Sequence, residues 1–117
     1  MKIFSLYTGD DGNSHFGEIE IDLCHVDGIE NLSNKYPVDG VTFNQVEPNE
    51  TYGWHNAPKR QYVITLSGEV DVEVSGGTIQ RIVPGDVVLV NERHEGSGHK
   101  TTVVGKVPWV CAYIPCL

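Results

Sequence analysis

The amino-acid sequence predicts an all-β fold built as a closed or sandwiched antiparallel sheet. Two observations lead to this prediction. Glycine (13 residues) and proline (6 residues) recur between short β-branched runs, a spacing typical of strands joined by tight turns. No stretch shows the periodicity of an amphipathic helix. With 117 residues, 39% of them hydrophobic, the chain is expected to form a single domain over residues 1–117.

The clearest strand pattern follows Gln61. Residues 62–66 are aromatic and β-branched, a turn follows at Ser67-Gly68, and residues 69–74 alternate strictly between carboxylates and valines. Successive side chains of a strand point to opposite faces, so the second segment should bury its valines and expose its carboxylates. We expect Gly68 to be structurally required in a two-residue turn that joins these two strands.

Further strand candidates lie on both sides of this region. Residues 87–90 are apolar on both faces of a strand and should therefore lie deep in the protein. The Ser75-Gly76-Gly77 turn should lead into a return strand. The remaining candidates are residues 16–23, 41–46, 78–83, 101–104 and 109–114. Seven to nine short strands of this kind favour a barrel or a sandwich.

The charge of the chain argues against two classes of partner. Its net charge is −8, and its 8 lysines and arginines form no run, so we expect no nucleic-acid binding. The same charge disfavours anionic membranes, and no apolar stretch approaches the ~20 residues of a membrane helix. The N-terminal apolar stretch is too short for a secretory signal, and Cys24, Cys111 and Cys116 show no close metal-type spacing. We therefore expect reduced cysteines and a cytoplasmic location.

Two segments of the chain resemble the two sequence motifs of the cupin family. The first runs from Gly53 through His55 to Gln61, and the second opens with Pro84-Gly85-Asp86 and ends at His99. The resemblance covers about half of the chain. It implies a cupin-type double-stranded β-helix, or jelly-roll barrel, with a pocket inside the barrel.

The resemblance also implies a metal site, but with altered ligands. The family holds its metal with three histidines and one glutamate. His55 matches the first histidine and His99 the third, at a longer spacing, whereas Ala57 and Gln61 stand where the family has its second histidine and its glutamate. Residues two or four apart on a strand share a face, so positions 55, 57 and 61 can all point into the barrel from one strand.

Two interpretations of this pocket follow. An amide oxygen is a weak, neutral donor, and loss of the carboxylate removes the charge that compensates a dication. We therefore favour a metal-free pocket in which His55, Gln61 and His99 bind a small polar molecule. The alternative is that the same three residues hold a divalent metal loosely.

The fold does not fix the function, because cupins include many reaction classes. In the favoured hypothesis, His55 and His99 act as hydrogen-bonding or proton-transfer groups toward the bound molecule. Two alternatives stay open: a metal-dependent enzyme of the dioxygenase or isomerase type, and a non-catalytic module that binds a sugar or a small acid. The resemblance and the open edges of small barrels also predict a homodimer.

Other polar segments carry weaker signals. Residues 8–16 are interpreted as a surface turn, although folded over the barrel they would bring His15 near the pocket. His94 and Glu95 precede His99 and are interpreted as solvated side chains.

Overall fold

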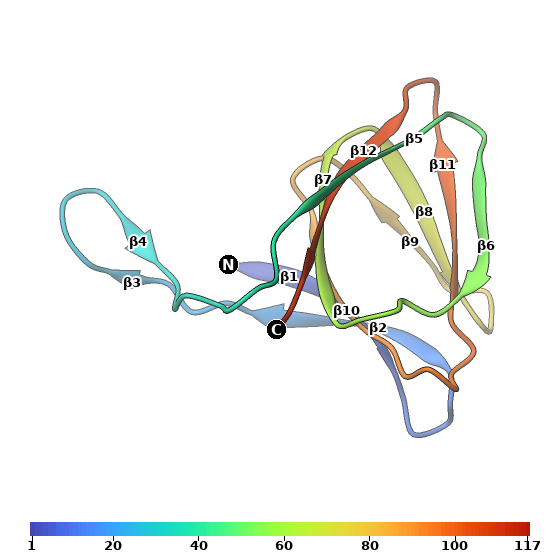
Figure 1. Ribbon diagram of the computed structural model, residues 1–117, viewed down its shortest axis with the longest axis horizontal. Coiled ribbons are helices and arrows are strands. Elements are labelled where there is room, and N and C mark those ends of the chain that lie inside the picture. Colours follow the sequence, from blue (N-terminus) through green and yellow to red (C-terminus); the bar gives the residue numbers. More distant parts are fainter.

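Twelve β-strands and no helix make up the structure, a computed structural model that describes residues 1–117 (Figure 1). The strands are β1 (Lys2–Thr8), β2 (Ser14–Glu20), β3 (Cys24–His25), β4 (Asn31–Leu32), β5 (Thr42–Val46), β6 (Thr51–His55), β7 (Gln61–Ser67), β8 (Glu69–Val74), β9 (Ile79–Ile82), β10 (Val87–Asn91), β11 (His99–Val104) and β12 (Trp109–Pro115). The prediction of an all-β fold is confirmed.

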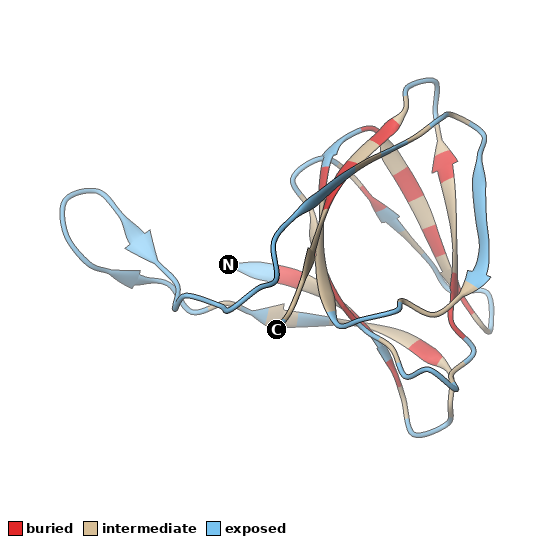
Figure 2. Ribbon diagram, viewed as in Figure 1, coloured by how far each residue is buried: buried red, intermediate tan, exposed pale blue.

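Two large sheets face each other and form the barrel. The six-stranded sheet has the order β2-β1-β10-β7-β12-β5, and the four-stranded sheet has the order β6-β11-β8-β9. All neighbouring strands are antiparallel except β1 and β10, which run parallel. The buried core lies between the sheets, with Leu6 and Val90 from the first sheet packed in one cluster with Val70 and Val103 from the second (Figure 2).

Several strands behave as their sequence pattern predicts. The three valines of β8 are buried, and its three carboxylates are partly exposed. The Ser75-Gly76-Gly77 turn joins β8 to β9, which pair as a hairpin. Three consecutive residues of β10, Val88, Leu89 and Val90, are buried, because this strand lies inside the six-stranded sheet. These side chains confirm that residues 87–90 lie deep in the protein.

The connection at Gly68 differs from the predicted turn between paired strands. β7 belongs to the six-stranded sheet and β8 to the four-stranded sheet, so the two strands do not pair. Gly68 lies at the corner where the chain crosses between the sheets, and its φ is +73°. A Cβ atom there would lie 2.2 Å from the carbonyl oxygen of Pro108. Glycine is therefore needed both for its left-handed backbone and for this close approach.

The expectation that positions 55, 57 and 61 share one strand is wrong. His55 is the last residue of β6, and Gln61 is the first residue of β7 in the other sheet. Pro58 lies in the intervening loop, where its missing N–H and fixed φ interrupt the extended ladder. His55 and Gln61 therefore reach the barrel interior from different sheets.

Between β2 and β5 the chain leaves the barrel as an arm, defined here as residues 22–35 (Figure 1). The arm carries β3 and β4, which pair with each other and with no other strand. The three cysteines are unpaired. No helix in the structure has the length and apolar character needed to cross a membrane.

Replacement of Gly68 tests the corner between the sheets. Gly68→Val should lower the free energy of unfolding by about 1–3 kcal/mol, because valine strains the backbone and meets Pro108. Urea denaturation measures the loss. Gly76→Val is the matched control, since Gly76 also has a positive φ but a Cβ atom there would meet no other atom within 4 Å. Equal losses in the two variants would contradict the close contact at the corner.

Candidate functional site

A cavity of about 430 Å³ lies inside the barrel between the two sheets. Of the 24 residues that line it, 14 are hydrophobic, so most of its wall is apolar. The three residues singled out from the sequence, His55, Gln61 and His99, all line this cavity. Its polar groups are thus few, an arrangement typical of small-molecule sites.

His55 and His99 are neighbours on the wall formed by the four-stranded sheet. They are paired residues on β6 and β11, and their ring centroids lie 4.4 Å apart. Gly98 allows this approach, because its φ is +76° and a Cβ atom there would lie 2.3 Å from the carbonyl oxygen of His55. Tyr52 covers His55 with a ring-centroid distance of 3.9 Å.

Hydrogen bonds determine which nitrogen of each imidazole is free. Nδ1 of His55 donates to the carbonyl oxygen of Gly53 at 2.6 Å, and Nδ1 of His99 donates to Oε1 of Glu92 at 2.7 Å. Both acceptors are oxygens without a proton to give, so Nδ1 carries the proton in each ring. The remaining nitrogen, Nε2, is then available as a hydrogen-bond acceptor in each neutral ring.

Glu92 is the carboxylate that orients His99. Its side chain is fully shielded from solvent, with 0% of its surface exposed. It accepts hydrogen bonds from Nδ1 of His99, from the hydroxyl of Ser14 and from the main-chain N–H of Ala57. Burial alone raises the pKa of Glu92, but these three donors outweigh burial and leave the pKa below its usual value. Glu92 is therefore ionised at neutral pH.

His55 is held in its neutral form. Burial is the main cause that lowers the pKa of His55, and the nearby His99 lowers it further. The carbonyl of Gly53 and the carboxylate of Glu92 oppose this effect without cancelling it. At neutral pH, Nε2 of His55 accepts hydrogen bonds and does not donate them.

A second polar group lies on the wall formed by the six-stranded sheet. Asn44 donates a hydrogen bond to the hydroxyl of Tyr113 at 3.2 Å, and both residues line the cavity. Burial raises the pKa of Tyr113 and also that of the adjacent Cys111 thiol. Both groups are therefore protonated and uncharged, and they add no charge to the cavity.

The structure brings together only two of the three residues predicted for the site. Gln61 lines the cavity from β7, in the sheet opposite the histidines, and no hydrogen bond joins it to either of them. His15 lies outside the cavity and pairs with Asp11 at 3.0 Å, and His94 is exposed.

The side chains present do not fit the metal site that the family resemblance implies. Three or more His, Cys, Asp or Glu side chains gather nowhere in the structure in a way that could hold a metal ion. Glu92 is hydrogen-bonded to Nδ1 of His99. Its carboxylate therefore does not lie beside Nε2, the nitrogen of His99 that is free to bind a metal. Two imidazoles and a distant amide supply no negative charge to compensate a dication.

The sequence pattern did not identify Glu92 or Ser14 as members of the site. Ser14 begins β2 and is completely buried, and Glu92 follows directly after β10. The available signal was a carboxylate placed immediately after a strand that is apolar on both faces. Such a carboxylate begins next to the buried interior, where it needs hydrogen-bond donors.

Comparison with known proteins shows the fold to which these strands belong. No protein-family model and no curated protein matches the chain. Among solved structures, a conserved protein of unknown function from Streptococcus pyogenes, SPY1581, is similar with a TM-score of 0.53 and 18% identity, over 73% of this chain and 68% of that chain. A cupin domain from Bordetella pertussis Tohama I, bp2299, is similar with a TM-score of 0.51 and 21% identity, over 73% of this chain and 99% of that chain. Together with the two facing sheets, these similarities show that the chain adopts the cupin-type jelly-roll fold predicted from its sequence.

Proposed function

We propose that this chain binds a small molecule in the barrel cavity and that His99, oriented by Glu92, exchanges a proton with it. The observation that carries the proposal is the fully shielded Glu92 carboxylate hydrogen-bonded to an imidazole that lines the cavity. A buried charge contributes little to the stability of a fold, because the cost of removing it from water offsets much of its attraction to its partners. Buried carboxylate–imidazole pairs at a cavity are instead typical of functional sites.

The lining of the cavity limits the chemistry of the bound molecule. A mostly apolar wall favours a ligand with an apolar body. Among the small polar molecules expected from the sequence, this favours those that carry a polar group on an apolar body. His55 offers a neutral acceptor nitrogen, and His99 offers a second one whenever its ring is neutral. A hydroxyl group, as in a phenol, an enol or an aliphatic alcohol, supplies the matching donor.

Proton transfer in this arrangement involves His99 and the ligand. The ligand O–H bond breaks as Nε2 of His99 takes the proton, and the electron pair stays on the ligand oxygen. Glu92 remains ionised and stabilises the imidazolium through the Nδ1–H hydrogen bond that it already accepts. His55 stays neutral and donates nothing to the ligand oxygen, so its Nε2 accepts a hydrogen bond from a second donor group of the ligand.

Substitution of His99 tests ligand binding. Titration with 4-ethylphenol, an apolar probe with one hydroxyl group, should shift the ring signals of His55 and His99 in NMR spectra. His99→Ala should weaken binding of this probe at least about tenfold, since one good hydrogen bond to a buried partner is worth about 1.4 kcal/mol or more. His94→Ala is the control, because His94 is exposed and outside the cavity. Equal effects of the two substitutions would contradict the proposed site.

Glu92 should make the stability of the protein depend on pH in one direction. Its pKa is lower in the folded protein than the ordinary value of 4.5, so its stabilising effect is complete above that value. The effect is lost as the pH falls through the lower pKa of the folded state. The difference in unfolding free energy between the wild type and Glu92→Gln should therefore be constant from about pH 6 upward and shrink below about pH 4.5.

Urea denaturation of both proteins between pH 3 and pH 7 measures this difference. The exposed Glu18→Gln on β2 is the matched control and should leave the pH dependence unchanged. A difference that stays constant down to pH 3 would show that Glu92 is not held as a buried carboxylate.

A further inference from the structure

The hydroxyl of Tyr113 is a hydrogen-bond donor on the cavity wall that the proposed proton transfer does not use. The amide nitrogen of Asn44 donates to the Tyr113 oxygen at 3.2 Å and to the sulfur of Cys111 at 4.0 Å. The Tyr113 oxygen therefore acts as an acceptor toward Asn44, and its own proton is directed elsewhere. The Cys111 thiol lies beside this hydroxyl, but sulfur is a weak acceptor. The Tyr113 proton is thus available to a ligand.

The hydroxyl of Tyr113 stays protonated. Burial is the main cause that raises the pKa of Tyr113, the nearby Cys111 and Tyr52 raise it further, and the hydrogen bond from Asn44 opposes them. An un-ionised phenol donates one hydrogen bond. The ligand group that lies against Tyr113 must therefore be an acceptor, in contrast to the hydroxyl group that gives its proton to His99.

Tyr113 and His99 lie toward the same end of the barrel. The chain crosses between the sheets at Gly68, and we call this end of the barrel the corner end. β12 begins at the corner end and β11 finishes there, as their pairing with β7 and β8 shows. Figure 1 shows these two strands running in opposite directions. Tyr113, in the second half of β12, and His99, the first residue of β11, therefore both lie away from the corner end.

The corner end of the cavity is apolar. Trp109, the first residue of β12, is buried there, and its Nε1–H donates to the hydroxyl of Thr65 at 3.0 Å. Val70 and Val103 line the cavity at the same end and belong to the buried core. The cavity thus has one apolar end and one end with polar groups on both walls. A ligand that fits it carries its polar groups at one end of an apolar body.

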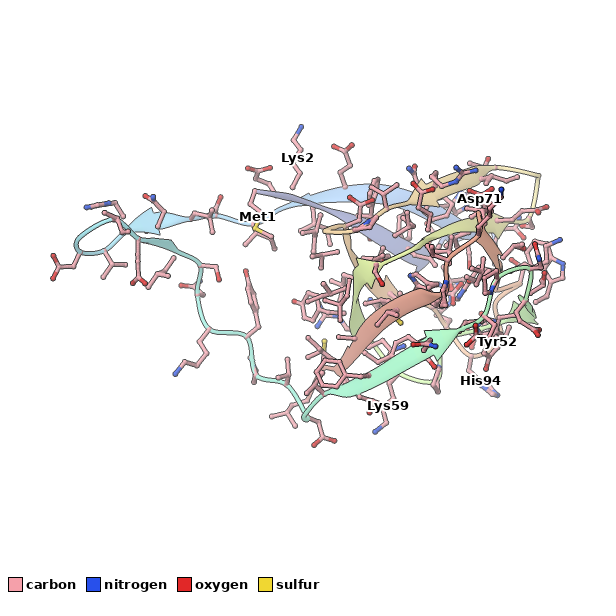
Figure 3. All side chains as sticks on the ribbon, turned by 90° about the horizontal axis from the view of Figure 1, so that it is seen from above. Met1, Lys2, Tyr52, Lys59, Asp71 and His94 are labelled. Atoms are coloured by element: carbon pink, nitrogen blue, oxygen red, sulfur yellow. The ribbon has the colours of Figure 1, made fainter.

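The two polar walls are close enough to bind one head group. His99 belongs to the four-stranded sheet and Tyr113 to the six-stranded sheet, and facing sheets pack about 10 Å apart. Tyr52 covers the ring of His55 and also contributes to the raised pKa of Tyr113, so it lies near both walls. Figure 3 shows Tyr52 beyond the tip of β5, the strand that carries Asn44. A small group between the walls can therefore contact both.

The charges around the cavity favour an uncharged acceptor group on the ligand. None of the 24 residues that line the cavity is a lysine or an arginine, and Glu50 is one of them. The ionised carboxylate of Glu92 is hydrogen-bonded to His99 and adds a second negative charge nearby. A carboxylate ligand would meet these charges without a lysine or arginine to pair with. A carbonyl oxygen accepts a hydrogen bond from Tyr113 without that cost.

We propose that the ligand is an uncharged hydroxycarbonyl compound, whose hydroxyl group binds His99 and whose carbonyl oxygen accepts a hydrogen bond from Tyr113. This inference rests on the proposed function, because the hydroxyl group is the one that exchanges a proton with His99. Asn44 is a positioning residue, since its hydrogen bond to the Tyr113 oxygen leaves the Tyr113 proton for the ligand. The apolar body of the ligand lies at the corner end, beside Val70 and Val103.

Binding of matched probes, measured by isothermal titration calorimetry, tests this proposal. 4-Ethylphenol carries a hydroxyl group alone, whereas 3- and 4-hydroxyacetophenone add a carbonyl oxygen at two different distances from it. Tyr113→Phe should weaken binding of the better hydroxyacetophenone about tenfold and leave binding of 4-ethylphenol unchanged, because it removes only the donor to the carbonyl oxygen. Asn44→Ala should weaken binding of the same hydroxyacetophenone and leave 4-ethylphenol unchanged. A purely structural role of either residue would weaken both probes alike.

Two controls complete the experiment. Tyr62→Phe removes a phenolic hydroxyl group from β7, outside the cavity lining, and should change the binding of no probe. 4-Hydroxybenzoate replaces the carbonyl group of the probe with a carboxylate and should bind more weakly than 4-hydroxyacetophenone. Thermal unfolding followed by circular dichroism verifies the fold of each variant.

The outcomes separate this inference from the proposed function. If 4-ethylphenol binds and depends on His99, but Tyr113→Phe affects both kinds of probe equally or neither, the carbonyl contact is wrong and the proposed function stands. Tighter binding of 4-hydroxybenzoate than of 4-hydroxyacetophenone would overturn the uncharged acceptor group. If the wild type binds none of the probes, or if His99→Ala leaves their binding unchanged, both proposals are overturned.

Discussion

The buried hydrogen bond between Glu92 and His99 is the interaction on which the rest of the site depends. Glu92 follows β10 in the six-stranded sheet, and His99 begins β11 in the four-stranded sheet. Ser14 and the main chain of Ala57 complete the set of donors, so one carboxylate connects four separate segments of the chain. Loss of any donor would leave a buried charge short of a hydrogen bond, which costs more than the bond itself contributes.

This constraint explains how a mostly apolar cavity can contain an oriented imidazole. The Glu92 carboxylate lies on the Nδ1 side of His99, and hydrogen bonds from other parts of the protein compensate its charge. The cavity itself is lined by the neutral imidazole of His55 and by a protonated tyrosine, and Glu50 is among its lining residues. A mostly apolar wall strengthens each hydrogen bond made beside it, because the local dielectric constant is lower than that of water.

The sequence predicted the fold well because its signals are local. Alternation of valines and carboxylates identified β8, and a run apolar on both faces identified β10. Gly53, His55 and His99 led to the correct barrel, and the two histidines meet through strand pairing. The predicted homodimer stays a prediction.

The remaining features depend on contacts between distant segments. Glu92 meets Ser14 across 78 positions of the chain, and no local pattern encodes that meeting. Even spacing suggests that Gln61 shares a strand face with His55, but the loop with Pro58 moves Gln61 to the other sheet.

The most direct test of the site is long-range ¹H–¹⁵N NMR of the histidine rings at pH 7. The structure predicts that Nδ1 carries a proton in both His55 and His99; a ring with its only proton on Nε2 would contradict it.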